Sequence, residues 1–415
     1  MLPIVGLTVG FISTLIGLTT SAMYDGHSML RVTPQTKRQE DHLRDLGKHQ
    51  GVSFIGGDPL VGDHSHVITS PQVLDFVLES LKKFETEHLL TNPDVGRSIR
   101  SQKVRTRMNG DISWDAYYDL DSINQYLSVQ SVGHPDLVTL TTIGKSFEVR
   151  DLFLLKINKG STTKPIIWID SNIHAREWIS SAVGLYLIDQ LLNSPDIQIQ
   201  AYLDDFNFHI LPMANPDGFV FSDLTDRFWR KTRSNTSATA INGCRGVDPN
   251  RNFDAYWLEN DGGSKDPCDL YFAGDAVFTE LECIAIAQYL DSILANLIAY
   301  ISLHSWGQNV LIPTGRDSTQ IPEYNEYIRI ANLAAAAHQI PHGMVYTTGS
   351  VFDVWHPAPG TSMDWAYLNF PSAKIHLTYE FRDKGQYTVL LPADQILPQC
   401  EEFMAGIKVI FDELK

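Results

Sequence analysis

The sequence is poor in cysteine and in basic residues, and each shortage excludes a class of protein. Four cysteines among 415 residues are too few for a disulfide scaffold, although they allow one or two bridges in an oxidising compartment. Acidic residues outnumber basic ones by 49 to 32, which gives a net charge of −17. This balance argues against a nucleic-acid-binding protein and against stable association with an anionic membrane.

Long apolar runs are missing from the sequence after residue 22. Before it, residues 4–18 are almost continuously apolar, and the small residues 20–22 follow, as they do before a signal-peptidase site. A signal anchor is the alternative, because residues 2–22 are about as long as a membrane span. The threonines and serines that interrupt the run favour cleavage. We therefore expect a signal peptide at residues 1–22 and a secreted protein.

The chain after residue 22 is long enough for more than one domain, and the charged fraction of the full sequence, 20%, excludes global disorder. Near the N-terminus, Ser70 and Pro71 suit the start of a helix whose apolar residues continue to Phe84 with a helical period. A basic segment follows at residues 97–107. Its basic residues are Arg97, Arg100, Lys103, Arg105 and Arg107.

This basic segment has two interpretations. It can be a solvated linker, which is common, or the site where a trypsin-like protease separates two compact pieces of a secreted protein. On the second interpretation, which we adopt, residues 23–96 form a removable prosegment and residues 97–107 are an activation linker. Residues 108–415 are then the main domain.

In the main domain, apolar strand-like segments alternate with longer helical ones. This alternation predicts an α/β domain with a central mixed, twisted β-sheet flanked by helices. Ligands of such domains bind outside the carboxyl ends of the strands. We expect strands at residues 137–140, 152–157, 166–170, 206–212, 297–303 and 375–379, and helices at residues 178–192, 279–294, 324–339 and 398–414.

Three side chains near expected strand ends have the character of a catalytic zinc site. His174 and Glu177 follow the strand 166–170, and His304 follows the strand 297–303. Two histidines and one glutamate leave a fourth position of a zinc ion open, which suits hydrolysis. Each signal is weak alone, because His-x-x-Glu is frequent and an isolated histidine is more often a core residue.

Other polar residues suit a peptide substrate. Glu380, after the last expected strand, could act as a general base, although without the zinc ligands an ion pair with Arg382 would be the better interpretation. Arg230 could stabilise an oxyanion. Asn250 and Arg251 could hold a free carboxylate, which accepts a bidentate pair of hydrogen bonds. Ordinary surface charge would explain either basic cluster in isolation.

Taken together, six motifs resemble those of the zinc carboxypeptidases of the carboxypeptidase A/B family. Six motifs in the family's order are far more specific than one of them. The resemblance covers residues 108–415, and the N-terminal part resembles the family's inhibitory prosegment more loosely. The motifs are His174-Ala175-Arg176-Glu177-Trp178, Asn215-Pro216-Asp217-Gly218, Trp229-Arg230-Lys231-Thr232-Arg233, Asn250-Arg251-Asn252, His304-Ser305 and Glu380-Phe381-Arg382-Asp383.

The resemblance implies a monomeric zymogen with a small α+β prosegment, activated by a trypsin-like protease, that cuts peptide and protein C-termini. One zinc ion would bind to His174, Glu177 and His304. Glu380 would be the general base on the attacking water, and Arg230 would stabilise the oxyanion. The substrate-binding residues would be Arg176, Asn250, Arg251, Ser305, His356 and Met363, and the disulfide would join Cys244 and Cys268. Cys283 and Cys400 do not belong to that pattern.

Residues 355–365 match the family's substrate-capping loop and specificity pocket. His356 occupies the position of a tyrosine that closes over the substrate, so we expect a weakened or pH-dependent cap. Met363 occupies the pocket floor, where enzymes that remove lysine or arginine carry an acidic residue. Because a buried basic head without a counter-charge is disfavoured, we expect a preference for apolar or aromatic C-terminal residues. The neighbouring Asp364 occurs in both specificity types.

Two other functions stay open at this point. The first is a catalytically silent peptide-binding protein on the same scaffold, and His356 is the only residue that suggests it. A related zinc deacylase that acts on small acylated molecules would not need the carboxylate clamp of Asn250 and Arg251 or the Met363 pocket. The intact zinc ligands and Glu380 favour the carboxypeptidase.

Overall fold

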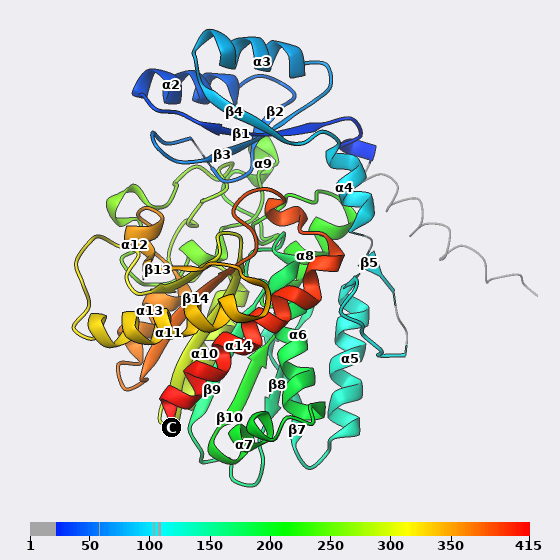
Figure 1. Cartoon of the computed structure of the whole chain (residues 1–415), viewed down its shortest axis with the longest axis vertical. Coiled ribbons are helices and arrows are strands. Elements are labelled where there is room, and N and C mark those ends of the chain that lie inside the picture. Colours follow the sequence, from blue (N-terminus) through cyan, green and yellow to red (C-terminus); the bar gives the residue numbers. More distant parts are fainter. Residues whose placement is uncertain (1–21, 58, 103, 107–108) are drawn as a thin grey trace, which may run out of the picture. The chain divides into compact units, whose positions relative to one another are not determined.

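The computed structural model describes residues 22–57, 59–102, 104–106 and 109–415. These residues divide into two compact units. Figure 1 colours the chain from blue at the N-terminus to red at the C-terminus. Unit 1 contains the described part of residues 1–103 together with residues 221–228 and 384–392. Unit 2 contains the rest of the chain from Val104 onward. The signal peptide expected at residues 1–22 lies outside the described residues, apart from Ala22.

Unit 1 contains a four-stranded antiparallel sheet in the order β2-β3-β1-β4. Helices α2 and α3 lie on the same side of this sheet (Figure 1). Leu30 and Val32 of β1 pack against Leu43 of α2 and Leu81 of α3 in one apolar cluster. The elements are β1 (Ser28–Thr33), α2 (Lys37–Leu46), β2 (Val52–Phe54), β3 (Ser65–Thr69), α3 (Leu74–Lys83), β4 (Glu87–Asn92) and α4 (Val95–Ser101).

The local sequence explains where α2 begins, but the start predicted for α3 differs from the one observed. The side chains of Thr36 and Gln39 form a reciprocal capping box at the start of α2. The start of α3 predicted at Ser70 and Pro71 is wrong, because α3 begins at Leu74 and has no side-chain cap. Residues 71–73 form a turn in which Val73 N–H donates to Ser70 O at 3.1 Å.

The basic segment at residues 97–107 is not wholly an irregular linker. Asp94 caps α4 by accepting from Arg97 N–H at 2.8 Å, so that Arg97 and Arg100 are helical. Lys103 and Arg107 lie outside the described residues. Arg105 belongs to the short strand β5 (Val104–Arg105), which pairs in parallel with β6 (Tyr117–Tyr118) in unit 2.

A buried arginine, Arg227, links residues 221–228 and 384–392 to the N-terminal part of unit 1. Arg227 donates from Nε to Gln102 Oε1 at 2.9 Å and from Nη2 to Val389 O at 2.6 Å. Tyr24 donates to Asp226 Oδ1 at 2.8 Å. Unit 1 therefore joins residues that are far apart in the sequence.

Unit 2 is built on an eight-stranded mixed sheet in the order β13-β12-β14-β11-β9-β10-β8-β7. This architecture confirms the predicted α/β class. Each predicted strand is present within a few residues, whereas the four-residue strands β12 and β13 were missed. The strands are β7 (Val138–Lys145), β8 (Asp151–Ile157), β9 (Ile166–Ser171), β10 (Asn207–Leu211), β11 (Leu297–Ser305), β12 (Asn309–Ile312), β13 (Thr347–Ser350) and β14 (Ile375–Phe381).

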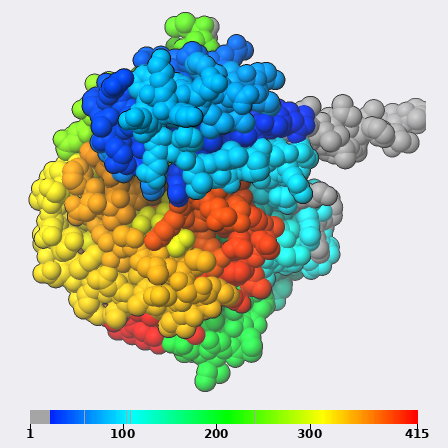
Figure 2. All heavy atoms as spheres, turned by 45° about the horizontal axis from the view of Figure 1, so that its top comes forward, coloured from blue at the N-terminus to red at the C-terminus, as the bar shows by residue number. Residues whose placement is uncertain are grey.

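Helices flank this sheet. Helix α14 packs against both α6 and α11, α6 packs on β9, β10 and β11, and α11 packs on β12 and β13. Helices α10 and α13 share an apolar core with Trp168 of β9 and Tyr300 of β11. In Figure 2, α11 and the segments that follow it form a continuous gold-to-orange surface. The main helices are α5 (Leu120–Gly133), α6 (Trp178–Asn193), α7 (Ile197–Asp205), α10 (Leu281–Ile293), α11 (Tyr324–His342), α13 (Ser362–Asn369) and α14 (Ile396–Leu414). Helix α8 (Pro216–Leu224) begins in unit 2, and its last four residues belong to unit 1.

Three neighbouring parallel strands, β9, β11 and β14, determine where the polar residues meet. In the parallel pair β11–β14, His304 lies opposite Glu380. In the parallel pair β11–β9, Leu303 lies opposite Ser171, and His174 follows three residues later. The strands β11 and β14 run two residues further than expected, so that His304 and Glu380 lie within strands rather than after them.

Among the described residues, none of the helices combines the length and the apolar character that crossing a bilayer requires.

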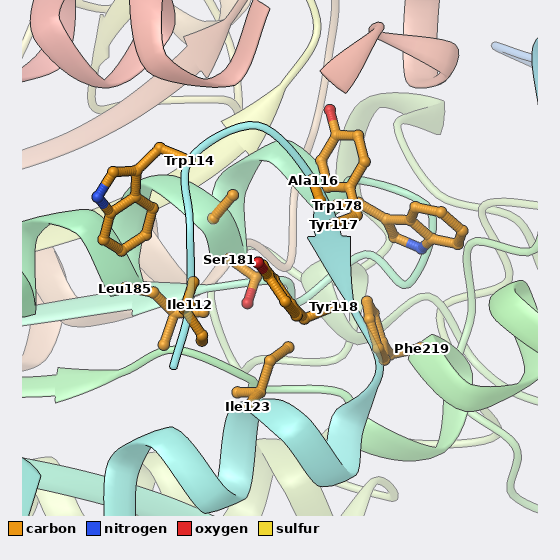
Figure 3. Close-up of a pocket in the computed structure, with 11 residues that line it drawn as sticks. Ile112, Trp114, Ala116, Tyr117, Tyr118, Ile123, Trp178, Ser181, Leu185 and Phe219 are labelled. Carbon is orange, nitrogen blue, oxygen red and sulfur yellow. The ribbon is translucent and has the colours of Figure 1, made fainter. Parts of the chain in front are cut away.

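A small hollow lined by aromatic side chains lies beside α6 in unit 2. Figure 3 shows Trp114, Tyr117, Trp178 and Phe219 around it. Its volume of about 20 Å³ holds roughly one water molecule, so it is too small for a peptide side chain. Ser181 also lines the hollow, and its buried Oγ has no hydrogen-bond partner among the described residues.

Two adjacent buried serines of α6 should therefore respond differently to truncation. Ser181→Ala removes a hydroxyl that has no protein partner among the described residues and should change the stability of unit 2 by less than about 0.5 kcal/mol. Ser180→Ala is the matched control: its Oγ accepts from Asn172 N–H at 3.0 Å and donates to Glu177 O at 2.7 Å, so the same change should destabilise by about 1–2 kcal/mol. Urea denaturation of the three proteins measures both effects. Equal destabilisation by the two changes would contradict this assignment.

Candidate active site

Three buried side chains meet in a cluster that could hold a metal ion. His174 and Glu177 lie between β9 and α6, and His304 lies near the end of β11. Their donor atoms all lie within 4.8 Å of one another. His174 Nδ1 is 2.8 Å from Glu177 Oε1 and 3.1 Å from His304 Nδ1. His304 Nδ1 is also 3.2 Å from Glu177 Oε2.

Acceptors outside the cluster hold the other nitrogen of each imidazole. His174 Nε2 is 3.2 Å from Asp248 Oδ1. His304 Nε2 is 3.0 Å from Ser302 Oγ, and that hydroxyl donates to Asp170 Oδ1 at 2.6 Å. The Nε2–H of His304 therefore donates outward, and Nε2 of His174 faces a carboxylate oxygen, which leaves the Nδ1 lone pairs of both rings directed into the cluster.

The donor set of this cluster fits zinc. Two neutral imidazole nitrogens and one carboxylate form the protein part of several catalytic zinc sites. Two lone pairs and a carboxylate converge here within 3.2 Å, and a divalent cation satisfies all three at once.

The charges around the cluster favour the protonation states that bind metal. Burial lowers the pKa of His174, and the Arg230 guanidinium lowers it further. Burial opposes the ionisation of Glu177, but the two neighbouring histidines, in their protonated forms, outweigh it and hold the pKa of Glu177 below the ordinary value. A neutral imidazole and an ionised carboxylate are the forms that act as ligands.

Glu380 lies on the neighbouring strand beside this cluster. Its Oε2 atom is buried and has no hydrogen-bond partner among the described residues. Burial raises the pKa of Glu380 well above its ordinary value, and the negative charge of Glu177 raises it further, against the opposing effect of Arg230 and Arg251. A carboxyl group with a raised pKa is suited to take up and return a proton.

Arg230 and His174 share one acceptor, Asp248. Arg230 Nε and Nη2 each lie 2.9 Å from Asp248 Oδ2, whereas His174 contacts the other oxygen. Arg230 Nη1 is 3.8 Å from Glu177 Oε1. Burial opposes the ionisation of Asp248, but Arg230 and His174 hold its pKa well below the ordinary value. One ionised carboxylate thus orients a candidate ligand and a candidate oxyanion donor together.

Asn250 and Arg251 lie together in a short 3-10 helix, η1 (Pro249–Arg251). The Oδ1 atom of Asn250 accepts from Ser362 N–H and Oγ–H at 2.9 and 3.1 Å, which leaves the amide nitrogen for a ligand. Arg251 is buried and donates to the backbone oxygens of Gly262 and Asn250 at 2.9 and 2.8 Å. Gly360, with φ at +78°, packs so closely that a Cβ there would lie 2.4 Å from Arg251 O.

Met363 is a buried residue of α13, and its sulfur accepts from Thr378 Oγ1 at 3.4 Å. The neighbouring Asp364 is fully buried and accepts from Gly315 N–H at 2.8 Å. Burial raises the pKa of Asp364 to about 7. Asp364 is therefore partly neutral near pH 7 and is not a fixed counter-charge for a basic ligand.

The other expected substrate-binding residues lie on different elements. Arg176 is buried with its guanidinium 5.9 Å from the ring centre of Trp306, and burial lowers its pKa to about 10. Ser305 contacts the cluster through its backbone, because its N–H donates to Glu177 Oε2 at 3.2 Å. His356 is half-buried, and its Nδ1 atom lies 3.1 Å from Pro357 O.

Two further expectations concern Arg382 and the cysteines. Arg382 does not pair with Glu380: its Nε donates to Glu402 Oε2 at 3.0 Å, in the core beside α14. Cys244 and Cys268 form a disulfide bond, as the resemblance implied. The remaining thiols, Cys283 and Cys400, are buried and unpaired.

Sequence reasoning missed several residues of this site. Asp248 stands two residues before the Asn250-Arg251-Asn252 motif, but nothing in its spacing assigns it to His174 and Arg230. Ser302 and Asp170 read as strand residues. The position of Ser302 gives a signal that could have predicted its contact with His304. Side chains two residues apart in a strand share a face, and Ser302 stands two residues before His304.

Comparison with known proteins agrees with this geometry. The family model for the zinc carboxypeptidases matches residues 123–406, and the model for the carboxypeptidase activation peptide matches residues 30–102. Zinc carboxypeptidase A 1 of Drosophila melanogaster is 33% identical over 94% of this chain and 93% of its own. Carboxypeptidase B of Rattus norvegicus is 33% identical over 97% of each chain.

Solved structures with similar folds include two that align over nearly the whole chain. Thrombin activatable fibrinolysis inhibitor has a TM-score of 0.86 and 29% identity, over 94% of this chain and 99% of its own. Carboxypeptidase A from Helicoverpa armigera has a TM-score of 0.81 and 26% identity, over 94% and 98%. The chain therefore belongs to the zinc carboxypeptidase family and is a metallocarboxypeptidase made with an activation peptide.

Proposed function

We propose that this zinc carboxypeptidase is a secreted, monomeric zymogen that removes apolar or aromatic residues from peptide C-termini after cleavage by a trypsin-like protease. The observation that carries the specificity is the buried, uncharged Met363 at the position that the resemblance gives to the pocket floor. Relatives named as carboxypeptidase A and as carboxypeptidase B are both similar to this chain, so their names do not decide between the two specificities.

In the proposed site, His174, Glu177 and His304 hold the zinc ion. Zinc, when bound, supplies Lewis-acid polarisation of the terminal peptide carbonyl. Glu380 takes a proton from the attacking water and returns it to the departing amine. Arg230, held by Asp248, donates N–H groups to the oxygen on which negative charge develops.

Arg251 is the proposed recognition group for the substrate's free carboxylate. Its guanidinium is buried, yet no carboxylate among the described residues lies within ion-pair distance of it. A buried cation with only neutral hydrogen-bond partners is costly until an anion arrives. A C-terminal carboxylate can supply that anion in a bidentate pair, with Asn250 donating beside it. This requirement for a free terminus makes the enzyme an exopeptidase.

Secretion and activation rest on separate observations. The disulfide Cys244–Cys268 is typical of an oxidising compartment, and the apolar N-terminal run suits a signal peptide. Arg105 and Arg107 provide cleavage sites for a trypsin-like protease close to the end of the matched activation peptide at residue 102.

The pocket proposal predicts a change of specificity in Met363→Asp. An acidic pocket floor pairs with a basic side chain and leaves a charge buried against an apolar one. The ratio of kcat/KM for C-terminal Phe over C-terminal Lys should therefore fall by at least about 100-fold. Met363→Leu, which nearly conserves volume, is the control and should change this ratio less than about threefold. An unchanged ratio in Met363→Asp would place the specificity pocket elsewhere.

The carboxylate clamp predicts a selective defect in Arg251→Gln. Loss of a charge-assisted bidentate pair should lower kcat/KM for a free C-terminus by about 100-fold or more. Arg316→Gln serves as the control, because Arg316 already pairs with Asp317 at 2.7 Å and should be dispensable. If both variants cleave free-acid peptides as the parent does, Arg251 does not bind the carboxylate.

The raised pKa of Asp364 predicts how stability depends on pH. The folded-state pKa of about 7 exceeds the ordinary value near 3.9, so the folded protein holds this proton longer than the unfolded chain. Relative to Asp364→Asn, the parent should lose stability between about pH 4 and pH 7, by up to about 1.4 kcal/mol per pH unit. Urea denaturation at several pH values measures this difference. Asp317→Asn is the control, because the Asp317 side chain is one-third exposed. A loss of stability as large in this control would contradict the assignment of the effect to the burial of Asp364.

A further inference from the structure

Tyr271 lies against two of the arginines to which the proposed function assigns chemistry. The ring centre of Tyr271 is 5.2 Å from the guanidinium carbon of Arg230 and 5.4 Å from that of Arg251. Both arginines are buried, whereas Tyr271 is half-buried. Two cations thus contact one aromatic ring at the distance of a cation–π interaction.

The contact of both guanidiniums with the Tyr271 ring reduces the cost of burying two like charges together. Two guanidiniums in one buried site repel each other, and burial together with the charge of Arg230 lowers the pKa of Arg251, against the opposing effect of Asp248. Asp248 is hydrogen-bonded to Arg230, but Arg251 has backbone carbonyls as its hydrogen-bond acceptors. A second carboxylate beside Arg251 would occupy the site intended for substrate. An aromatic ring attracts both cations and leaves their N–H groups free to bind anions.

The backbone around Tyr271 is hydrogen-bonded to the segment that carries Asp248 and Arg251. Tyr271 N–H donates to Asp269 Oδ1 at 2.7 Å, and Tyr271 O accepts from Ser264 N–H at 2.9 Å. The next residue, Phe272, accepts from Asp248 N–H at 2.8 Å. Three residues before Tyr271, Cys268 is bonded to Cys244. The ring therefore belongs to a constrained loop.

We propose that Tyr271 is a positioning residue that sets the spacing between Arg230 and Arg251. This inference rests on the proposed function, in which Arg230 contacts the oxyanion and Arg251 the terminal carboxylate. In the substrate, these two groups are separated by one amide nitrogen and one α-carbon. The two guanidiniums must therefore hold one relative position to engage both groups of a single C-terminal residue, and the shared ring provides that constraint.

The test compares Tyr271→Leu, which removes the π face, with Tyr271→Phe, which keeps it and loses only the hydroxyl. Two quantities are measured on the zinc-loaded, trypsin-treated enzyme: kcat for a blocked dipeptide ending in Phe, and the inhibition constant of 3-phenylpropanoate, which presents a carboxylate alone. Tyr271→Leu should lower kcat and raise the inhibition constant, each by about tenfold or more. Tyr271→Phe should stay within about threefold of the parent in both.

Single-arginine variants separate this inference from the proposed function. Arg230→Gln should reduce mainly kcat, and Arg251→Gln should raise mainly the inhibition constant, so that Tyr271→Leu combines both defects. If the arginine variants are defective and Tyr271→Leu is not, the positioning role is wrong while the proposed function stands. If neither arginine matters, the proposed function itself fails. Equal defects in the Phe and Leu variants would assign the effect to the hydroxyl and overturn the inference.

Protein quality is followed by zinc content and circular dichroism. If Tyr271→Leu does not fold, Tyr271→Gln replaces it, because a polar side chain of similar length suits a half-buried position and also lacks a π face. The same two defects are expected in this variant, and parental values for both quantities would overturn the inference.

Discussion

The parallel pairing of β9, β11 and β14 is the constraint on which the rest of the site depends. Parallel strands in the middle of a sheet end at one edge, and their register places His304 opposite Glu380. The loop after β9 then needs only three residues to bring His174 to the same point. Three segments separated by more than 70 residues in the sequence therefore meet without a long loop.

Concentrating charge at a buried edge is costly, and the surrounding contacts show how the fold limits that cost. Asp248 accepts from Arg230 and lies 3.2 Å from His174 Nε2, so one carboxylate contacts a candidate metal ligand and compensates a guanidinium. The positive charge of Arg251 is compensated less than that of Arg230, because its partners are backbone carbonyls and the ring of Tyr271 rather than a carboxylate. This unequal compensation leaves the site electropositive where a free carboxylate is expected to bind. On the proposed function, this incompletely compensated buried cation would contribute binding energy for the carboxylate of the substrate.

The sequence predicted the α/β class, most strands of the sheet and the residues of the metal cluster, because these depend on local patterns and on motifs in a fixed order. It did not predict β12, which is four residues long, or the start of α3, where a turn over residues 71–73 precedes the helix. The contacts of Asp248 with His174 and Arg230, and those of Tyr271 with Arg230 and Arg251, could not be predicted from the sequence either. Both roles arise from tertiary contacts that no spacing rule encodes.

The most direct test of the central claim is a release assay on the full chain with and without prior trypsin treatment, and with and without a zinc chelator. Blocked dipeptides ending in Phe, Leu, Lys or Arg are the substrates. The account predicts release of Phe and Leu after trypsin treatment, loss of that release with the chelator, recovery on adding zinc, and little release of Lys or Arg. Release that survives complete removal of zinc would contradict the assignment of His174, Glu177 and His304 as the catalytic metal site.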